Sequence, residues 1–542
     1  MTFLCNFFSI LNLKVFDDKS NKFFFLFLFF YFILGCIISY QDTVEGNIYF
    51  GADNYRAFGD LTQVFGWHNR IKVHPLFLLF TQPITLLING IVQNDRLSVI
   101  ILQSLCGALF VKTFFKILLD LNLKAAIIKY FSLILGFSFS FIMFTSTPET
   151  FIFTGLSSII FFYYLVTKKN CNDFYTKKNV IILVLFSTLL TGMVITNYVL
   201  FLVGITVLLF YIRNKILYNF SFIFKLAFLS FFFILFLSCL QKIVWNNCPI
   251  FISSLLDGLL GKGYEETLYI QNNYFDISEM KNYLLLFFAY PLFSTKPQLF
   301  NVNNSIYYIV FTEYNIFQKL FICFFTALIS FAILLFLFNI FKLRKLNNKF
   351  PLILGSSFLF FNLSLHFLYG KSEAFIYSCH FLYLVLICLA IILDNLLQVN
   401  IKLIKIFSCF ALVFTMGQFI NNLYNFNETR ILAYVILNKI YILTPVIRLF
   451  IYYFIGILIF FAFVTNLRII NSFLDKPDLS ASVTFNKSCI KNIALCFFVA
   501  CFIFELVSIT LQAGGLRGFL QLSVEEFHLN ELYNFFVMKL NS

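Results

Sequence analysis

The residues best suited to chemistry stand in one polar stretch near the N-terminus. Between Tyr49 and Phe77 the chain reads YFGADNYRAFGDLTQVFGWHNRIKVHPLF, which includes Asp53, Arg56 and His74. A carboxylate at a membrane surface can take a proton from a hydroxyl group, because burial and neighbouring charges set its pKa. An arginine can hold a phosphate through two parallel hydrogen bonds. The stretch therefore carries a candidate base and a candidate cation for binding an anion.

Each of these residues also has a purely structural interpretation. Asp53 could cap a helix that starts near Tyr55. His74 precedes a proline, which favours an extended backbone and a fixed corner, so its ring could face a cavity or only support the fold. The pattern indicates that Asp60 is a solvated helix residue. We expect His68 and Arg70 to be polar surface residues. The spacing of His68 and His74 is not a strong metal signature.

Two further places offer polar side chains among apolar runs. Glu149 follows Pro148 in the turn TSTPET, where it could start a helix or face a cavity as a second acid. The stretch HFLYGKSEAFIYSCHFLYL, from His366 to Leu384, carries a second polar cluster at an expected outer helix start. Its substrate-binding candidates are Lys371, Glu373, Tyr377 and His380. The alternative is an interfacial Lys and Tyr that anchor the helix.

Composition indicates the surroundings in which these residues must work. The chain has 542 residues, of which 61% are hydrophobic and 12% charged. Soluble domains carry about 25% charged residues, so a chain of this kind predicts a membrane protein. The net charge of +14 is better explained by loop topology than by nucleic-acid binding, because Lys and Arg mark cytoplasmic loops. The 13 Cys form no C-x-x-C pair, and we expect small buried apolar residues rather than a disulfide framework.

Apolar runs of about 20 residues predict an all-α polytopic protein. We expect one polytopic membrane domain over 1–542 with thirteen spans, at 23–40, 97–116, 130–147, 150–167, 180–195, 197–212, 222–243, 319–341, 351–368, 376–393, 403–421, 446–466 and 491–511. The first run is too long for a signal peptide core and lacks a cleavage site, so we expect it to be retained.

Charge decides how the apolar stretch 75–92 is interpreted. If it does not cross, the N-terminus is cytoplasmic and most of the 39 Lys and Arg lie on inner loops. If it crosses, every later loop changes side and the bias inverts. We therefore expect 75–92 to lie at or dip into the outer face. The large outer segments are then 41–96, a first outer loop with interfacial helices, and 244–318.

The first outer loop resembles that of the GT-C superfamily of glycosyltransferases, which use polyprenyl-phosphate sugars. The resemblance rests on Asp53-Asn54-Tyr55-Arg56, then His74-Pro75-Leu76-Phe77, then Arg96-Leu97-Ser98, and extends to the TPET turn. Protein O-mannosyltransferases and lipid A aminoarabinose transferases belong to this superfamily. The chain departs from the pattern where Asn54 replaces a second acid and Leu76 a second proline. It also has Cys379-His380-Phe381 where members often carry an Arg-Tyr pair for the lipid phosphate.

The resemblance implies an inverting glycosyltransferase with Asp53 as general base. Its partners would be a polyprenyl-phosphate sugar donor, a lipid, glycan or protein acceptor and the membrane, with no nucleic acid. No cofactor is certain, a divalent metal is left open, and no metal ligand is assigned. We expect an integral protein of a bacterial inner (plasma) membrane. The alternatives are a lipid or oligosaccharide transporter or flippase, for which the expected spans carry few charges near their centres, and a non-catalytic membrane subunit.

Overall fold

A computed structural model describes fourteen stretches of the chain. They are residues 18–38, 49–65, 68, 73–169, 175–212, 216–245, 250, 280, 283–302, 306–312, 318–319, 348–368, 374–397 and 401–436. The spans expected at 319–341, 446–466 and 491–511 lie outside the described residues, apart from residue 319. So do the candidates Lys371 and Glu373.

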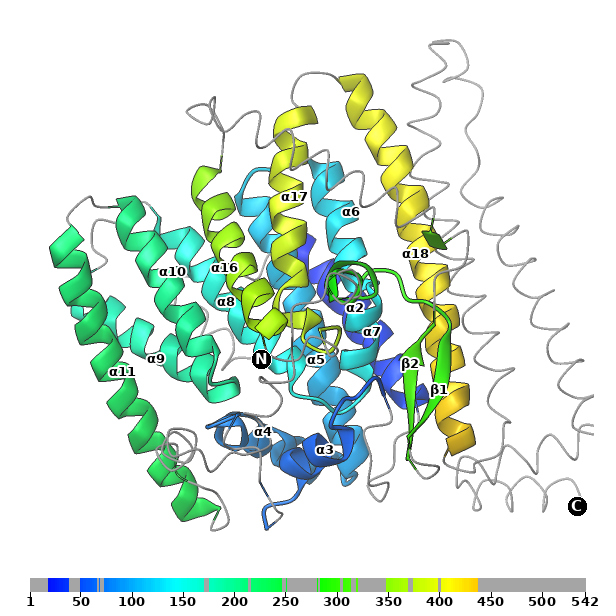
Figure 1. Ribbon diagram of the computed structural model, residues 1–542, viewed down its shortest axis with the longest axis horizontal. Coiled ribbons are helices and arrows are strands. Elements are labelled where there is room, and N and C mark those ends of the chain that lie inside the picture. Colours follow the sequence, from blue (N-terminus) through cyan, green and yellow to red (C-terminus); the bar gives the residue numbers. More distant parts are fainter. Residues whose placement is uncertain are drawn as a thin grey trace, which may run out of the picture. The chain divides into compact units, whose positions relative to one another are not determined.

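The described residues are mostly helical, as the apolar runs predict (Figure 1). The longer helices are α2 (Asp18–Ile37), α5 (Asp95–Asp120), α8 (Phe151–Lys168), α9 (Lys177–Met193), α10 (Asn197–Ile212), α11 (Ile216–Val244), α16 (Lys349–Leu368), α17 (Leu382–Leu397) and α18 (Ile401–Ile436). Five stretches within these helices are long and apolar enough to cross a membrane: Ser20–Ile37, Asp95–Asp120, Phe151–Lys168, Asn219–Val244 and Lys349–Phe367. The protein is thus a helical protein with the spans of a membrane protein.

One expected span is broken. Residues 130–147 were expected to form one helix, but the chain forms α6 (Ala125–Gly136) and α7 (Phe139–Ser146), bent by 51°. The break frees backbone groups that a membrane interior cannot satisfy with water. The Tyr31 hydroxyl donates to the carbonyl of Gly136 over 2.8 Å, and the Ser140 amide donates to the carbonyl of Pro291 over 3.2 Å. These partners, distant in sequence, stabilise the bend, which periodicity alone does not predict.

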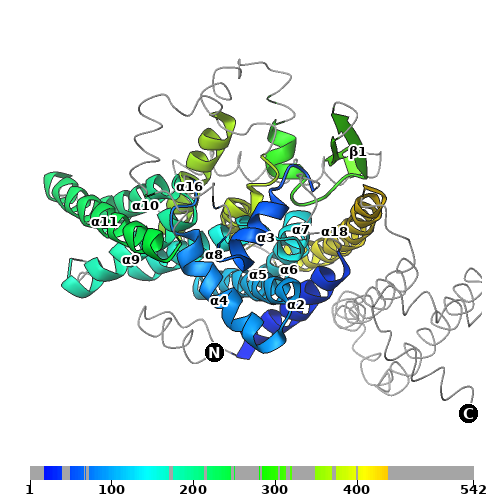
Figure 2. The same cartoon turned by 90° about the horizontal axis from the view of Figure 1, so that it is seen from below.

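The segment between α2 and α5 begins and ends at the same end of these helices. Arg96, in the first turn of α5, donates to the carbonyl of Ile38 just after α2, over 2.7 Å. Within the segment, α3 (Asn54–Thr62) and α4 (Phe77–Val92) lie across the helix ends in Figure 1. Figure 2, viewed from that end, shows both in front of the neighbouring helices. This geometry is what a segment 75–92 that does not cross would give.

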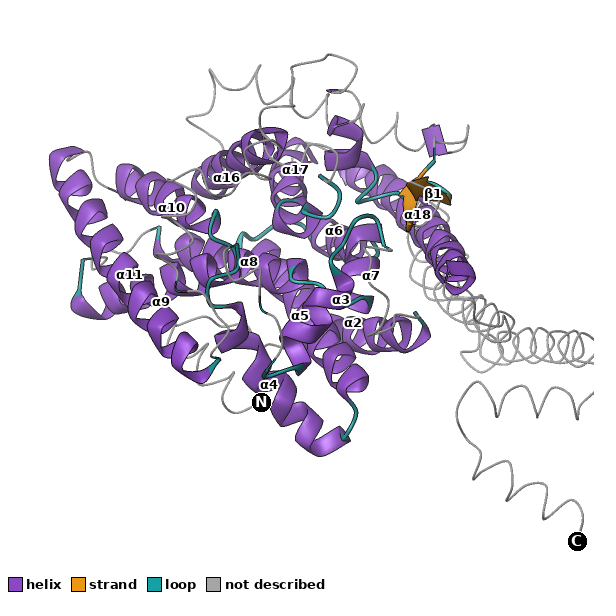
Figure 3. Ribbon diagram, turned by 60° about the horizontal axis from the view of Figure 1, so that its bottom comes forward, coloured by secondary structure: helices purple, strands orange, loops and turns teal. Residues whose placement is uncertain are grey.

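A small β-hairpin contacts the chain just before α3. Strands β1 (Pro297–Val302) and β2 (Ile306–Phe311) pair antiparallel, orange in Figure 3, after the π-helix η2 (Leu285–Ala289). The Phe50 amide donates to the carbonyl of Ile309 over 3.1 Å, and the Phe50 ring stacks on Phe311. The hairpin therefore contacts the chain just before α3 through both its backbone and an aromatic ring.

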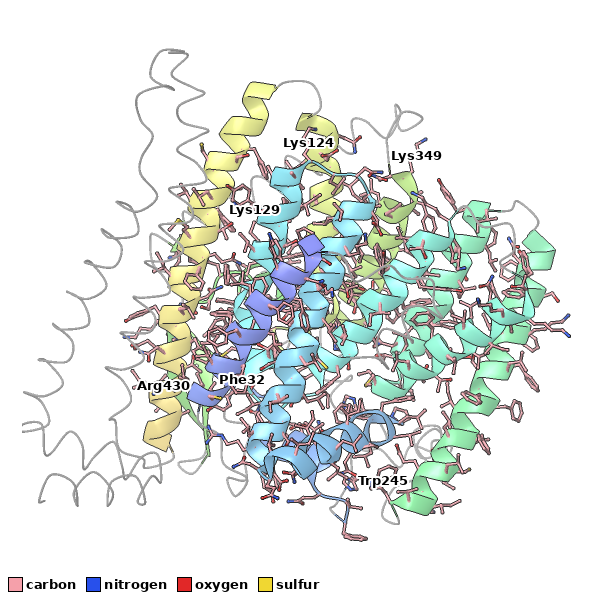
Figure 4. The ribbon with its side chains drawn as sticks, turned by 180° about the vertical axis from the view of Figure 1, so that it is seen from behind. Phe32, Lys124, Lys129, Trp245, Lys349 and Arg430 are labelled. Carbon is pink, nitrogen blue, oxygen red and sulfur yellow. The ribbon has the colours of Figure 1, made fainter. Side chains whose placement is uncertain are left out.

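The opposite end of the helices carries basic residues. The backbone N–H of Lys124, before α6, donates to the carboxylate of Asp394 of α17 over 2.8 Å, and the side-chain Nδ2 of Asn348 donates to the carbonyl of Leu121 over 2.9 Å. Figure 4 shows Lys124 and Lys349 at this end, away from Trp245 and α4. Basic residues that were assigned to inner loops are thus gathered at one end.

The later helices differ from the expected boundaries. The span expected at 376–393 starts with the short helix η5 (Ser378–His380), and α17 follows it. Helix α18 continues to Ile436, beyond the span expected at 403–421. The chain divides into two compact units, one of residues 1–404 and 424–433 and one of 405–423 and 434–542. All the site residues described below belong to the first unit.

Candidate functional site

Arg56 connects the acidic residues of the first outer segment. Its Nε lies 3.3 Å from a carboxylate oxygen of Asp53, and its Nη1 lies 2.8 Å from one of Asp60. Residues three and four positions apart share one face of a helix, so α3 aims both carboxylates at the same guanidinium. The pattern D-x-x-R-x-x-x-D was the signal in the sequence that could have revealed this cluster.

Asp60 and His68 are buried, which corrects the expectation that they are solvated surface residues. Asp60 is 5% exposed and His68 is 2% exposed. Nδ1 of His68 lies 2.8 Å from Oδ1 of Asp60. The backbone carbonyl of Asp60 also accepts from Gln82 of α4. The sequence analysis missed this packing because Asp60 looks solvated when α3 is considered alone, and α4 covers it only in the tertiary structure.

Glu149 joins the same cluster from another part of the chain. Asn54 donates through Nδ2 to the carbonyl of Pro148 over 2.9 Å, which places α3 on the turn before α8. Glu149 is 1% exposed and interacts electrostatically with Arg56. Gln103 of α5 donates to the carbonyls of Thr147 and Glu149 and so fixes the turn. Asn54, where the GT-C pattern has an acid, has a packing role here.

The electrostatic balance of the cluster favours the charged guanidinium. Burial lowers the pKa of Arg56, but Glu149, Asp60 and Asp53 act in the opposite direction and the net pKa is raised. Three carboxylates face one guanidinium, so the cluster carries excess negative charge. Such a site attracts protons or cations and repels anions unless a further cation is supplied.

Asp53 occupies the N-cap position of α3, but its side chain makes no capping hydrogen bond. Its carboxylate contacts Arg56 instead, and its side chain is 15% exposed. Capping therefore does not explain this aspartate. Asp53 and Arg56 are thus the partly exposed members of the cluster, whereas Asp60 and Glu149 are buried.

The second polar cluster lies beside the start of α8. The Phe151 ring is 5.4 Å from the ring of Tyr377 and 5.8 Å from that of His380. The ring of His366, on α16, stacks on the ring of Tyr377 with a centroid distance of 4.3 Å. Its centroid lies 6.2 Å from that of the His380 ring. Both histidines are buried. The two clusters thus meet the same turn, the first through Glu149 and the second through Phe151. His366 is a further member of the second cluster that no pattern in the sequence singled out.

His74 lies at the corner that its position before proline predicts. Its Nδ1 lies 2.5 Å from the carbonyl oxygen of Met193, at the end of α9, and donates a hydrogen bond to that oxygen. The Leu76 amide donates to the carbonyl of Gly192, and Gln241 of α11 donates to that of Pro75. These contacts give His74 a clear structural role.

Among the described residues, no three His, Cys, Asp or Glu side chains form a group that could hold a metal ion. Comparisons with protein-family models, with curated proteins and with solved structures found no match to this chain.

Proposed function

We propose that the protein is a membrane glycosyltransferase of the GT-C type, which moves a sugar from a polyprenyl phosphate to an acceptor hydroxyl outside the membrane. The observation that carries this proposal is the cluster of Asp53, Arg56 and Glu149. It joins two expected outer loops at one turn, beside Tyr377 and His380. Groups that act on one substrate must meet in this way.

In the proposed reaction Asp53 is the general base. The acceptor oxygen attacks the anomeric carbon while its proton passes to the Asp53 carboxylate. The bond between that carbon and the phosphate oxygen breaks on the opposite side, so the configuration inverts. Arg56 orients Asp53 rather than holding the phosphate, because its guanidinium already contacts two carboxylates. In this proposal Tyr377 and His380 contact the donor.

The topology belongs to the same proposal. We infer thirteen spans, a cytoplasmic N-terminus and a site on the outer face of a bacterial inner membrane. Support comes from the hydrogen bond of Arg96 to Ile38, which brings the start of α5 and the end of α2 together, and from Lys124 and Lys349, which lie at the other end of the helices (Figure 4). The exposed apolar residues Ile84, Leu87 and Ile91 of α4 would then lie in the membrane surface.

The test is transfer by the purified protein. It is incubated with a panel of polyprenyl-phosphate sugars, and membrane acceptors are examined by mass spectrometry. Asp53→Asn keeps the size of the side chain but removes the base, so we expect transfer to fall about 10²–10⁴-fold. Asp95→Asn, an exposed aspartate at the start of α5, is the matched control and should retain activity. An Asp53→Asn protein with the rate of the wild type would contradict the assignment of the base.

A transporter is the second candidate, and the break between α6 and α7 favours it. Broken helices are typical of transporters, where half-helix ends contact the cargo. Here Tyr31 and Pro291 occupy the backbone groups at the break, which favours a rigid bend over a cargo site. Movement of a fluorescent polyprenyl-phosphate sugar across vesicles, without transfer to any acceptor, would support the transporter instead.

A further inference from the structure

His68 and Asp60 form a hydrogen-bonded pair with a distinctive geometry. Nδ1 of the imidazole faces the carboxylate at 2.8 Å, and the side chains are 1% and 7% exposed. The other ring nitrogen, Nε2, is buried and has no hydrogen-bond partner among the residues that the structure describes. A carboxylate that fixes one nitrogen and leaves the other available is the arrangement by which proteins orient a proton-transferring histidine.

A purely structural role accounts poorly for the bare nitrogen. Leaving a buried polar atom unsatisfied costs about 1–3 kcal/mol, and buried polar groups in folded proteins are nearly always paired. A histidine that only bonded to α3 for structural support would need its Nδ1 bond and nothing more. The unsatisfied Nε2 therefore points to a ligand that brings its own polar atom.

The position of the pair within the cluster suggests which polar atom that is. Asp53, Arg56, Asp60 and His68 form one chain of contacts, with Asp53 at one end and His68 at the other. Among the described residues, the charged groups around His68 are Asp60 and Arg56 of α3 and, through Arg56, Asp53 and Glu149. From α4 comes the neutral amide of Gln82, which donates to the Asp60 carbonyl. The excess negative charge opposes a phosphate, and a protonated His68 would offset it.

We propose that His68, oriented by Asp60, is a catalytic residue that donates a proton to the departing phosphate of the sugar donor. The inference rests on the proposed glycosyl transfer. As the bond from the anomeric carbon to the phosphate oxygen breaks, its electron pair stays on that oxygen, which takes the proton from Nε2. The acceptor proton goes to Asp53. The neutral imidazole and the protonated carboxyl group then return to their starting forms by proton exchange with water.

The test is the pH profile of transfer, measured between about pH 5 and pH 9 with the purified wild type and two His68 variants. The wild type should give a bell, in which Asp53 must be ionised and His68 protonated. His68→Asn keeps an N–H near Nδ1 for Asp60 but removes Nε2. Its rate should fall about 10²–10⁴-fold, and the decline at alkaline pH should disappear. His68→Gln places an N–H near Nε2, so it should be faster than His68→Asn and should also lack the alkaline decline.

The outcomes separate this inference from the proposed function. If the wild type transfers sugar but His68→Asn keeps the alkaline decline, whatever its rate, His68 is structural and the inference is overturned. The inference is also overturned if His68→Gln has the same rate and the same alkaline decline as the wild type. This comparison does not need His68→Asn, so it still decides the matter if His68→Asn fails to fold. A wild type that transfers sugar from no polyprenyl-phosphate donor would remove the proposed function itself, and this inference with it.

Discussion

Arg56 is the residue on which the stability of the acidic cluster depends. Arg56→Gln would leave Asp53, Asp60 and Glu149 without their guanidinium, and the loss of one partner of a buried ion pair costs about 3–5 kcal/mol. We expect a clearly lower thermal midpoint in detergent at neutral pH. The deficit should shrink as the pH falls through the range where carboxylates ordinarily titrate, because protonation removes the uncompensated charge. Arg56→Lys, which keeps a cation but loses the planar fork, should fall in between.

The matched control for that experiment is Lys177→Gln, since Lys177 is an exposed cation at the start of α9. A surface change of this kind alters the free energy of unfolding by no more than about 0.5 kcal/mol. An Arg56→Gln protein as stable as this control, or a deficit that grows toward acid pH, would show that the three carboxylates do not rely on Arg56.

At the scale of single elements, the bend between α6 and α7 depends on a contact from α2. Tyr31→Phe removes the hydroxyl that bonds the Gly136 carbonyl and leaves that buried acceptor unsatisfied, at a cost of about 1–3 kcal/mol. Thermal unfolding in detergent should show the loss. Tyr211→Phe, at an exposed tyrosine of α10, serves as the control and should change little. Equal midpoints for the two variants would mean that the Tyr31 bond does not stabilise the bend.

For the whole molecule, the prediction concerns the two sides of the membrane. Single cysteines introduced at Thr62, in α3, and at Lys349, at the start of α16, should be labelled from opposite sides of the membrane. The reason is that short inner loops retain Lys and Arg, and Lys349 lies at the basic end of the helices, away from α4. The parent protein gives the background labelling of the native cysteines. Labelling of both positions from the same side would overturn the topology.

The sequence by itself indicated that the helices belong to a membrane protein and which stretches of the chain carry its polar residues. Long apolar runs with few charges predict membrane helices whatever their neighbours are, because each must bury its own backbone polar groups. The expected run at 97–116 lies within α5, and the run at 150–167 agrees with α8 to within one residue at each end. The corner at His74 followed from the restriction that a proline places on the preceding residue.

Only the tertiary structure decided which side chains meet. Glu149 reaches Arg56 because Asn54 docks α3 on the turn at Pro148, a contact across 94 positions that no local pattern contains. His366 reaches His380 because α16 packs beside η5. Asp60 and His68 looked solvated because burial depends on the elements that pack against a helix, and α4 covers Asp60 through Gln82. Periodicity reports the preference of one segment for apolar surroundings, whereas the site arises from contacts between segments, which are satisfied only when the chain is folded.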